Sequence, residues 1–193
     1  MLDTLRQKFI HSRPLLSAEE FCFLSLLDLI LFEAEKKKQK LFRTLREKKS
    51  ITVVDVGSGY FRYGHALLQA MQKINPQVKL YATDLERKRF RYNPALFVKG
   101  DVTTKGNRFG TIDIFTVFNP FPGIPEIHRI PIDYRRNALF VGCVDWNKEL
   151  FKSTLTSNGF TPLVWQKNKY WDEMRAWWNN SDPFVVGVTI QKQ

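Results

Sequence analysis

Short apolar segments recur along the chain from residue 51 onward, and polar, glycine or proline residues separate each one from the next. They are rich in β-branched and aromatic residues, which is typical of buried strands. A helical pattern follows the first segment until Asn75–Pro76 stops it, and another runs from Trp146 to Ser157, where Asn158–Gly159 supplies a natural C-cap. The predicted strands are residues 51–56, 78–83, 95–98, 112–118, 138–144, 160–166 and 184–191.

Strands that alternate with helices in this way predict an α/β fold. We expect a seven-stranded, mostly parallel sheet with right-handed crossovers and helices on both faces. The first 50 residues lie outside this alternation and have a helical pattern. The spacing of Ser17 and Glu20 is that of a capping box, so one helix is predicted to begin near Ala18, apolar in its first half and basic in its second, where Leu41, Phe42 and Leu45 form a stripe.

These patterns divide the chain into a helical extension, residues 1–50, and a ligand-binding domain, residues 51–193. The extension is expected to cover one side of the sheet. Its cationic end either presents charge to a partner or belongs to a lid with no binding role.

Composition fits one folded globular domain, since the 193 residues are 44% hydrophobic and 25% charged. The longest apolar run, residues 21–32, is too short to span a bilayer, and the N-terminus lacks the apolar centre of a signal peptide. Cys22 and Cys143 are far apart in apolar surroundings, which predicts neither a disulfide framework nor a metal site. A cytoplasmic protein without a membrane segment is expected.

The charge of the chain favours a polyanionic partner. Thirty Lys and Arg against nineteen Asp and Glu give a net charge of +11 and a pI of about 9.7, which favours RNA. Eight of the cations lie between Lys36 and Lys49, and four lie between Arg87 and Arg91. The alternative is that the first cluster complements a helix dipole and keeps the surface solvated.

Polar residues and glycines follow the predicted strands where parallel strands end. Asp55, Gly57 and Gly59 close the first strand, and glycine there can take a positive φ that lets the main chain approach a ligand. Asp84 follows the second strand and Asp101 the third. Because an open α/β sheet binds its ligand at the carboxyl ends of its strands, these residues predict a nucleotide site.

From residue 51 to the C-terminus the chain resembles the class I S-adenosylmethionine-dependent methyltransferases, with a Rossmann-like sheet. Asp55-Val-Gly57-Ser-Gly59 matches the family's acid-x-Gly-x-Gly loop, and Gly159–Phe160 matches its Gly-Phe pair. The resemblance implies that Asp84, with Glu86 as the alternative, binds the ribose hydroxyls of S-adenosylmethionine and that Asp101 accepts from the adenine amino group. The cofactor-binding residues implied are Asp55, Gly57, Ser58, Gly59, Asp84, Leu85, Asp101, Val102 and Asn119.

The chain departs from the family at Phe61, where many members carry a small residue, and its connection between the second and third strands is short. A nicotinamide-binding fingerprint would need glycine at position 62, which is arginine.

Methyl transfer requires alignment of a nucleophile with the methyl group more than it requires catalytic residues. Asn119-Pro120-Phe121-Pro122 resembles a permuted Asn-Pro-Pro-aromatic motif, which implies that Asn119 and Pro120 accept from a planar amino group while Phe121 stacks on it. The same residues are also compatible with a strand-ending turn. Other candidates are weaker: His65 and His128 as bases, and Cys143, which fits a buried thiol better than a nucleophile.

The sequence thus predicts a methyltransferase that acts on a base nitrogen of RNA, such as rRNA or tRNA. Two alternatives stay open: methylation of a protein side chain, and a catalytically inactive RNA-binding or assembly module. Residues 170–178, rich in Trp, either stack on RNA bases or pack against the sheet.

Overall fold

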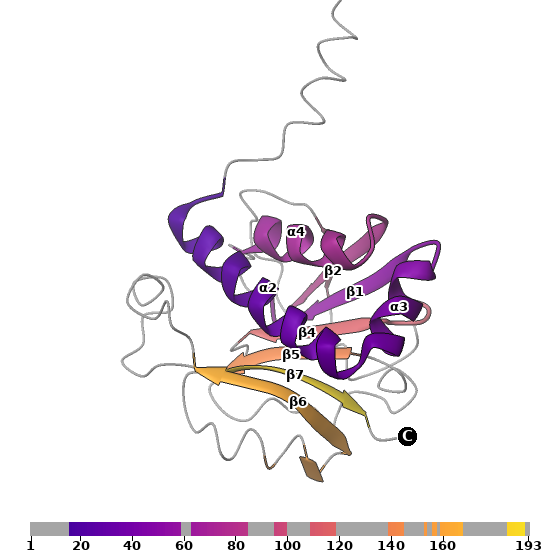
Figure 1. Ribbon diagram of the computed structural model, residues 1–193. Coiled ribbons are helices and arrows are strands. Elements are labelled where there is room, and N and C mark those ends of the chain that lie inside the picture. The colour runs from indigo at the N-terminus through magenta and orange to yellow at the C-terminus, as the bar shows by residue number, and fades with distance from the viewer. Residues whose placement is uncertain are drawn as a thin grey trace, which may run out of the picture.

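The computed structural model describes residues 16–58, 63–84, 95–99, 109–118, 139–144, 153, 156–157, 159–167 and 185–191. Within them the chain forms one sheet of seven strands in the order β3-β2-β1-β4-β5-β7-β6, with helices α2, α3 and α4 lying across one face (Figure 1). The strands are β1 (Ile51–Val56), β2 (Val78–Asp84), β3 (Leu96–Lys99), β4 (Ile114–Phe118), β5 (Leu139–Val144), β6 (Phe160–Lys167) and β7 (Val185–Gln191).

The predicted strands are all present, within two residues at each end. Parallel pairings join only five of the seven, β1 to β5, whereas β7 pairs antiparallel with both β5 and β6. β1 lies between β2 and β4, so the strand order reverses beside β1. In open α/β sheets this reversal marks the crevice where ligands bind.

Both faces of the central strand β1 are buried. Along β1, Ile51 and Val53 join the large apolar cluster beneath the helices, while Val54 and Val56 join a second cluster on the opposite face. Alternation of this kind follows from the two-residue period of a strand. The described helices cover the first face, and the prediction of helices on both faces remains a prediction because most of the segments between later strands lie outside the described residues.

The N-terminal helix begins as predicted. α2 (Ala18–Lys37) carries a capping box in which Ser17 Oγ accepts from the Glu20 N–H at 3.2 Å and the Glu20 carboxylate accepts from the Ser17 N–H at 3.1 Å. Phe23, Leu27 and Ile30 on this helix are fully buried against the sheet and α4. The extension therefore shares one core with the sheet.

The prediction of one continuous helix is wrong. The helix breaks at Lys38, whose φ of −137° and ψ of 49° end α2 and start α3 (Gln39–Glu47). The Lys37 ammonium donates to the Leu163 carbonyl of β6 at 2.6 Å. After the break, α3 turns away from the axis of α2 (Figure 1), and its Phe42 and Leu45 are buried. Tertiary contacts, rather than helix propensity, set this break.

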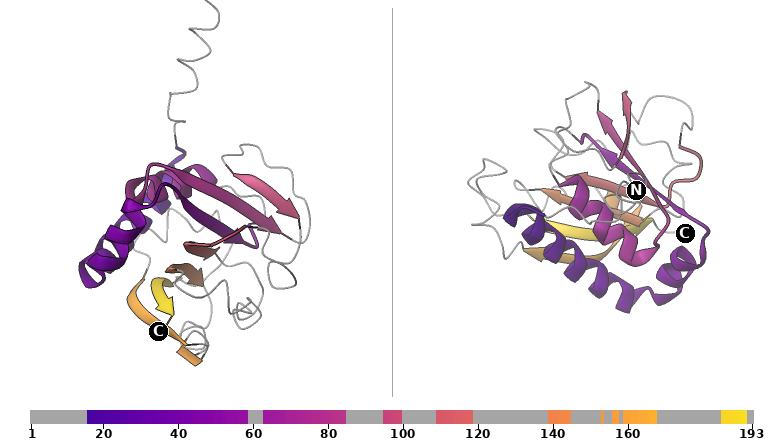
Figure 2. Two further views of the ribbon diagram at one scale, coloured as in Figure 1. Left: turned by 90° about the vertical axis from the view of Figure 1, so that its right-hand side faces the viewer. Right: turned by 90° about the horizontal axis from the view of Figure 1, so that it is seen from above.

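The direction of the helices places them relative to the sheet edges. α4 (Gly64–Ile74) runs from the carboxyl end of β1 to the amino end of β2, and it ends at Asn75 as predicted. α2 lies beside α4 and runs the same way, as the view from above in Figure 2 shows. α3 leads into the amino end of β1. The Asn75 amide fixes it there by donating to the Leu45 and Lys48 carbonyls at 2.9 and 2.8 Å.

The second predicted helix, Trp146–Ser157, falls mostly outside the described residues. Ser153, Thr156 and Ser157 are helical, and Gly159 follows with a φ of 82° and an N–H that donates to the Thr156 carbonyl at 3.0 Å. The predicted glycine C-cap is confirmed.

Candidate functional site

A tight turn follows β1 at the carboxyl edge of the sheet. Gly57 has a φ of 66°, which L-residues with a side chain rarely adopt, so the predicted positive φ is confirmed at this position. Ser58 is buried, and both its N–H and its hydroxyl donate to the Thr83 carbonyl, at 2.9 and 3.2 Å. The turn is thereby fixed to the end of β2, directly before Asp84.

Asp55 lies two residues before Gly57, within β1. Its carboxyl group is fully buried and accepts from the Thr116 hydroxyl at 2.6 Å and from the Tyr63 hydroxyl at 3.0 Å. Its main-chain carbonyl accepts from the Thr83 hydroxyl at 2.9 Å. These bonds connect β1 to β2, to β4 and to the residue that precedes α4, so the three elements that form the edge are held together through one residue.

The environment of Asp55 favours its neutral form. Burial raises the pKa of this carboxyl, and the negative charge of Asp84 adds to the increase. The hydrogen bonds from Thr116 and Tyr63 lower the pKa but only in part offset burial, so the pKa is about 7. The group is therefore close to half ionised at neutral pH. A cationic ligand beside it would favour the ionised carboxylate.

Four predicted cofactor residues come together: Asp55, Gly57, Ser58 and Asp84 lie at the carboxyl ends of β1 and β2. β4 ends at this same edge with Phe118, the residue before the predicted motif. The other predicted residues lie outside the described part of the chain, and their roles remain predictions: Gly59, Leu85, Asp101, Val102, Asn119, Pro120 and Phe121. Outside it too are Phe61, Arg62, His128, residues 87–91 and residues 170–178.

Sequence reasoning did not identify the hydroxyl groups around Asp55. Thr116 interrupts an otherwise apolar strand, and Thr83 precedes Asp84, so a polar residue within a buried strand was the available signal. Tyr63 carried no such signal. Its ring packs on Phe23 of α2 with centroids 5.0 Å apart, which links the N-terminal helix to the site.

No described helix has the length and apolarity needed to cross a membrane. The described His, Cys, Asp and Glu side chains form no group that could hold a metal ion.

No protein-family model matches this sequence, and a search of curated proteins gives no match. Solved structures do match. An S-adenosylmethionine-dependent methyltransferase from Aquifex aeolicus is similar over 79% of this chain and 88% of its own, with 15% identity and a TM-score of 0.53. The plantazolicin methyltransferase BpumL, solved with S-adenosylhomocysteine, is similar over 92% of this chain and 86% of its own, with 11% identity and a TM-score of 0.52.

A third structure, a putative S-adenosylmethionine-dependent methyltransferase from Listeria monocytogenes, is similar over 84% of this chain and all of its own, with 13% identity and a TM-score of 0.52. At these identities the likeness concerns the arrangement of the backbone. The chain has the Rossmann-like fold of the S-adenosylmethionine-dependent methyltransferases.

Proposed function

We propose that this protein is an S-adenosylmethionine-dependent methyltransferase. The observation that carries the proposal is the Gly57 turn, which is fixed to β2 through Ser58 and the Thr83 carbonyl at the reversal point of the strand order. A nucleotide-like ligand binds in this crevice in folds of this kind. The solved structures with this fold include methyltransferases crystallised with S-adenosylhomocysteine, such as BpumL.

The residues at the edge fit this cofactor chemically. Gly57 has no side chain to keep a ligand from the main chain, and Asp84 offers carboxylate oxygens to ribose hydroxyls at the end of β2. Asp55 is a buried acceptor whose ionised form a nearby cation would stabilise. The cofactor supplies a methyl group on a sulfonium. The chain's own contribution is to bind it, orient it and exclude water.

For the substrate, we propose a base nitrogen of RNA. The net charge of +11 supports a polyanionic substrate. Asn119, Pro120 and Phe121 follow β4 directly, and their resemblance to an amine-holding motif supports nitrogen as the acceptor. The fold does not select among substrates, because structures that share it include a plantazolicin methyltransferase and a glycopeptide N-methyltransferase.

Calorimetry with S-adenosylhomocysteine tests the cofactor assignment. Wild-type protein should bind, and Gly57→Arg should abolish binding because it places a long side chain where the main chain must approach the ligand. Gly110→Arg is the matched control, since Gly110 also has a positive φ, 69°, but precedes β4 at the amino edge with open space around it. Absence of binding by the wild type, or equal loss in both variants, contradicts the proposal.

Transfer of labelled methyl groups tests the substrate. With radiolabelled S-adenosylmethionine, label should enter RNA rather than protein, and Asn119→Ala should reduce turnover far more than it reduces cofactor affinity. Label in protein supports methylation of a protein side chain. Cofactor binding without transfer to either polymer supports a catalytically inactive module.

A further inference from the structure

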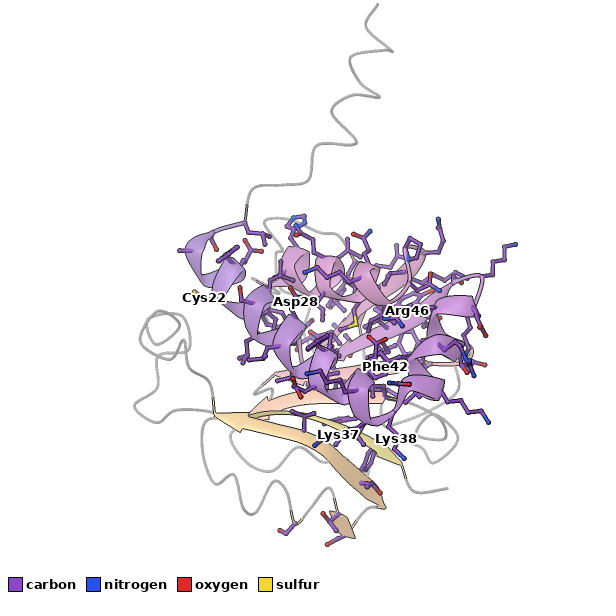
Figure 3. The ribbon with its side chains drawn as sticks, in the orientation of Figure 1. Cys22, Asp28, Lys37, Lys38, Phe42 and Arg46 are labelled. Atoms are coloured by element: carbon purple, nitrogen blue, oxygen red, sulfur yellow. The ribbon has the colours of Figure 1, made fainter. Side chains whose placement is uncertain are left out.

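A groove runs along the outer surface between the C-terminal half of α2 and the helices α3 and α4. It consists of two adjoining hollows of about 430 and 560 Å³ that share Phe32, Glu35 and Arg46. Figure 3 shows Asp28 on α2, and Phe42 and Arg46 on α3, around this region. We call the surface lined by Phe32, Lys36, Lys40, Arg43 and Arg46 the α2–α3 groove.

The carboxylates at the groove are already paired. Glu33 pairs with Lys36 at 2.8 Å, and Asp28 pairs with Lys73. The two carboxylate oxygens of Glu35 accept hydrogen bonds from the two terminal nitrogens of the Arg46 guanidinium. The hydrogen bond from Arg46 lowers the pKa of Glu35, which keeps this carboxylate ionised and occupied.

Within the described chain, the exposed Lys40 and Arg43 have no such partner. The groove therefore carries an excess of positive charge that points to an anionic partner.

Other cations between residues 36 and 49 bond to groups outside the groove. Lys37 donates to the Leu163 carbonyl, and Lys48 pairs with the buried Asp113. They hold the helices on the sheet. The basic segment predicted from the sequence thus divides into cations that bond to the sheet and cations that face solvent.

An exposed aromatic ring lies within this cationic surface. The Phe32 side chain is 57% exposed, and the Lys36 ammonium lies 4.2 Å from its ring centroid. Single-stranded nucleic acid is bound by this combination, because bases stack on aromatic rings while cations contact the phosphates. An acidic polypeptide would use the cations but would gain less from an exposed phenyl ring.

The groove lies far from the cofactor edge. α3 ends where β1 begins, and the six residues of β1, about 20 Å at about 3.3 Å per residue, separate it from the Gly57 turn. We propose that the α2–α3 groove docks single-stranded RNA, so that a substrate must reach from the amino edge of the sheet to its carboxyl edge. The statement about substrate length rests on the proposed function, whereas docking does not.

Fluorescence anisotropy with a labelled oligouridylate of about twenty nucleotides tests docking at several salt concentrations. Arg43→Glu should weaken binding about tenfold and reduce the slope of log affinity against log salt by about 0.7, the value for one phosphate contact. Phe32→Ala should weaken binding roughly tenfold and leave the slope unchanged, because stacking releases no counterions. Both side chains are exposed, so neither change opens the core.

Lys79→Glu is the matched control. Lys79 is exposed on β2 next to the core residue Leu80, so its side chain points to the face opposite the helices, and the charge change equals that of Arg43→Glu. RNA affinity of this variant should stay within about twofold of the wild type, because only general charge changes.

Three results overturn the docking proposal. The first is that Arg43→Glu and Phe32→Ala bind RNA with wild-type affinity, and the second is that Lys79→Glu loses as much RNA affinity as they do. The third is that the protein binds polyglutamate as tightly as RNA and with the same dependence on Phe32. S-adenosylhomocysteine calorimetry on the same variants separates this proposal from the proposed function. RNA binding through the groove without cofactor binding supports the docking proposal and contradicts the proposed methyltransferase function. Cofactor binding without RNA binding through the groove supports the proposed function and contradicts docking.

Discussion

Replacement of Asp55 by asparagine should change how the stability of the protein depends on pH. Burial raises the pKa of this carboxyl from its ordinary value of 3.8 to about 7 in the folded protein, so between these pH values the folded state holds a proton that the unfolded chain releases. The contribution of this group to the free energy of unfolding therefore decreases with rising pH by about 1.4 kcal/mol per unit, about 4 kcal/mol in total. Above pH 7 the whole contribution is lost.

In Asp55→Asn the new side chain has nearly the shape of the aspartate but cannot ionise. The decrease in the free energy of unfolding that Asp55 causes should therefore be absent from this variant. Urea unfolding at pH 5, 6, 7 and 8 measures the difference between variant and wild type, in which the titration of other groups cancels. The stability of the variant relative to the wild type should rise by about 1.4 kcal/mol per unit between pH 5 and 7 and level off above that range. Parallel curves for the two proteins would refute the argument that burial raises the pKa of Asp55.

Three other changes test the packing of the helices around the site by urea unfolding. Ser17→Ala removes the cap of α2 and should cost about 1 kcal/mol; no loss would mean that the capping box is not formed. Asn75→Ala leaves two main-chain carbonyls near the end of α3 without their donor and should cost about 2 kcal/mol, and a neutral effect would contradict the anchoring of α3. Tyr63→Phe removes one hydrogen bond to Asp55 and should cost about 1 kcal/mol, more than the control Tyr81→Phe on the opposite face; equal effects would show that the Tyr63 bond is not stabilising.

Local patterns in the sequence predicted the parts of the fold that depend on local chemistry. The strands followed from apolar runs bounded by breakers, and the start of α2 followed from its capping box. The positive φ of Gly57 followed from its place after a strand, and the C-cap at Gly159 from its place after a helix. In each case the residues that decide the conformation are neighbours in the chain.

Features set by distant contacts were not predictable in this way. The break at Lys38 accompanies the bond between Lys37 and a carbonyl 126 residues away, and nothing in the local pattern of α2 indicates that bond. The division of the basic segment into paired and solvent-facing cations also depends on remote partners, such as Asp113 for Lys48. The reversed direction of β7 has the same origin, because an apolar run alone does not give the orientation of a strand.

The candidate site was predicted in part for the same reason. Asp55, Gly57 and Asp84 were identifiable because each lies at or beside the carboxyl end of a strand, where the fold places its ligand. The hydroxyl groups that hold Asp55 come from β4 and from the start of α4. Their contact with Asp55 requires the parallel register of β1 and β4, which the sequence does not specify.

The cofactor site at the carboxyl edge of the sheet is tested most directly by a titration of isotope-labelled protein with S-adenosylhomocysteine, followed through the main-chain amide signals in nuclear magnetic resonance spectra. The amide signals of Gly57, Ser58 and Asp84 should shift on binding, while that of Arg43 at the amino edge should not. Unchanged signals at the Gly57 turn, or shifts confined to the α2–α3 groove, would contradict a cofactor site at the carboxyl edge of the sheet.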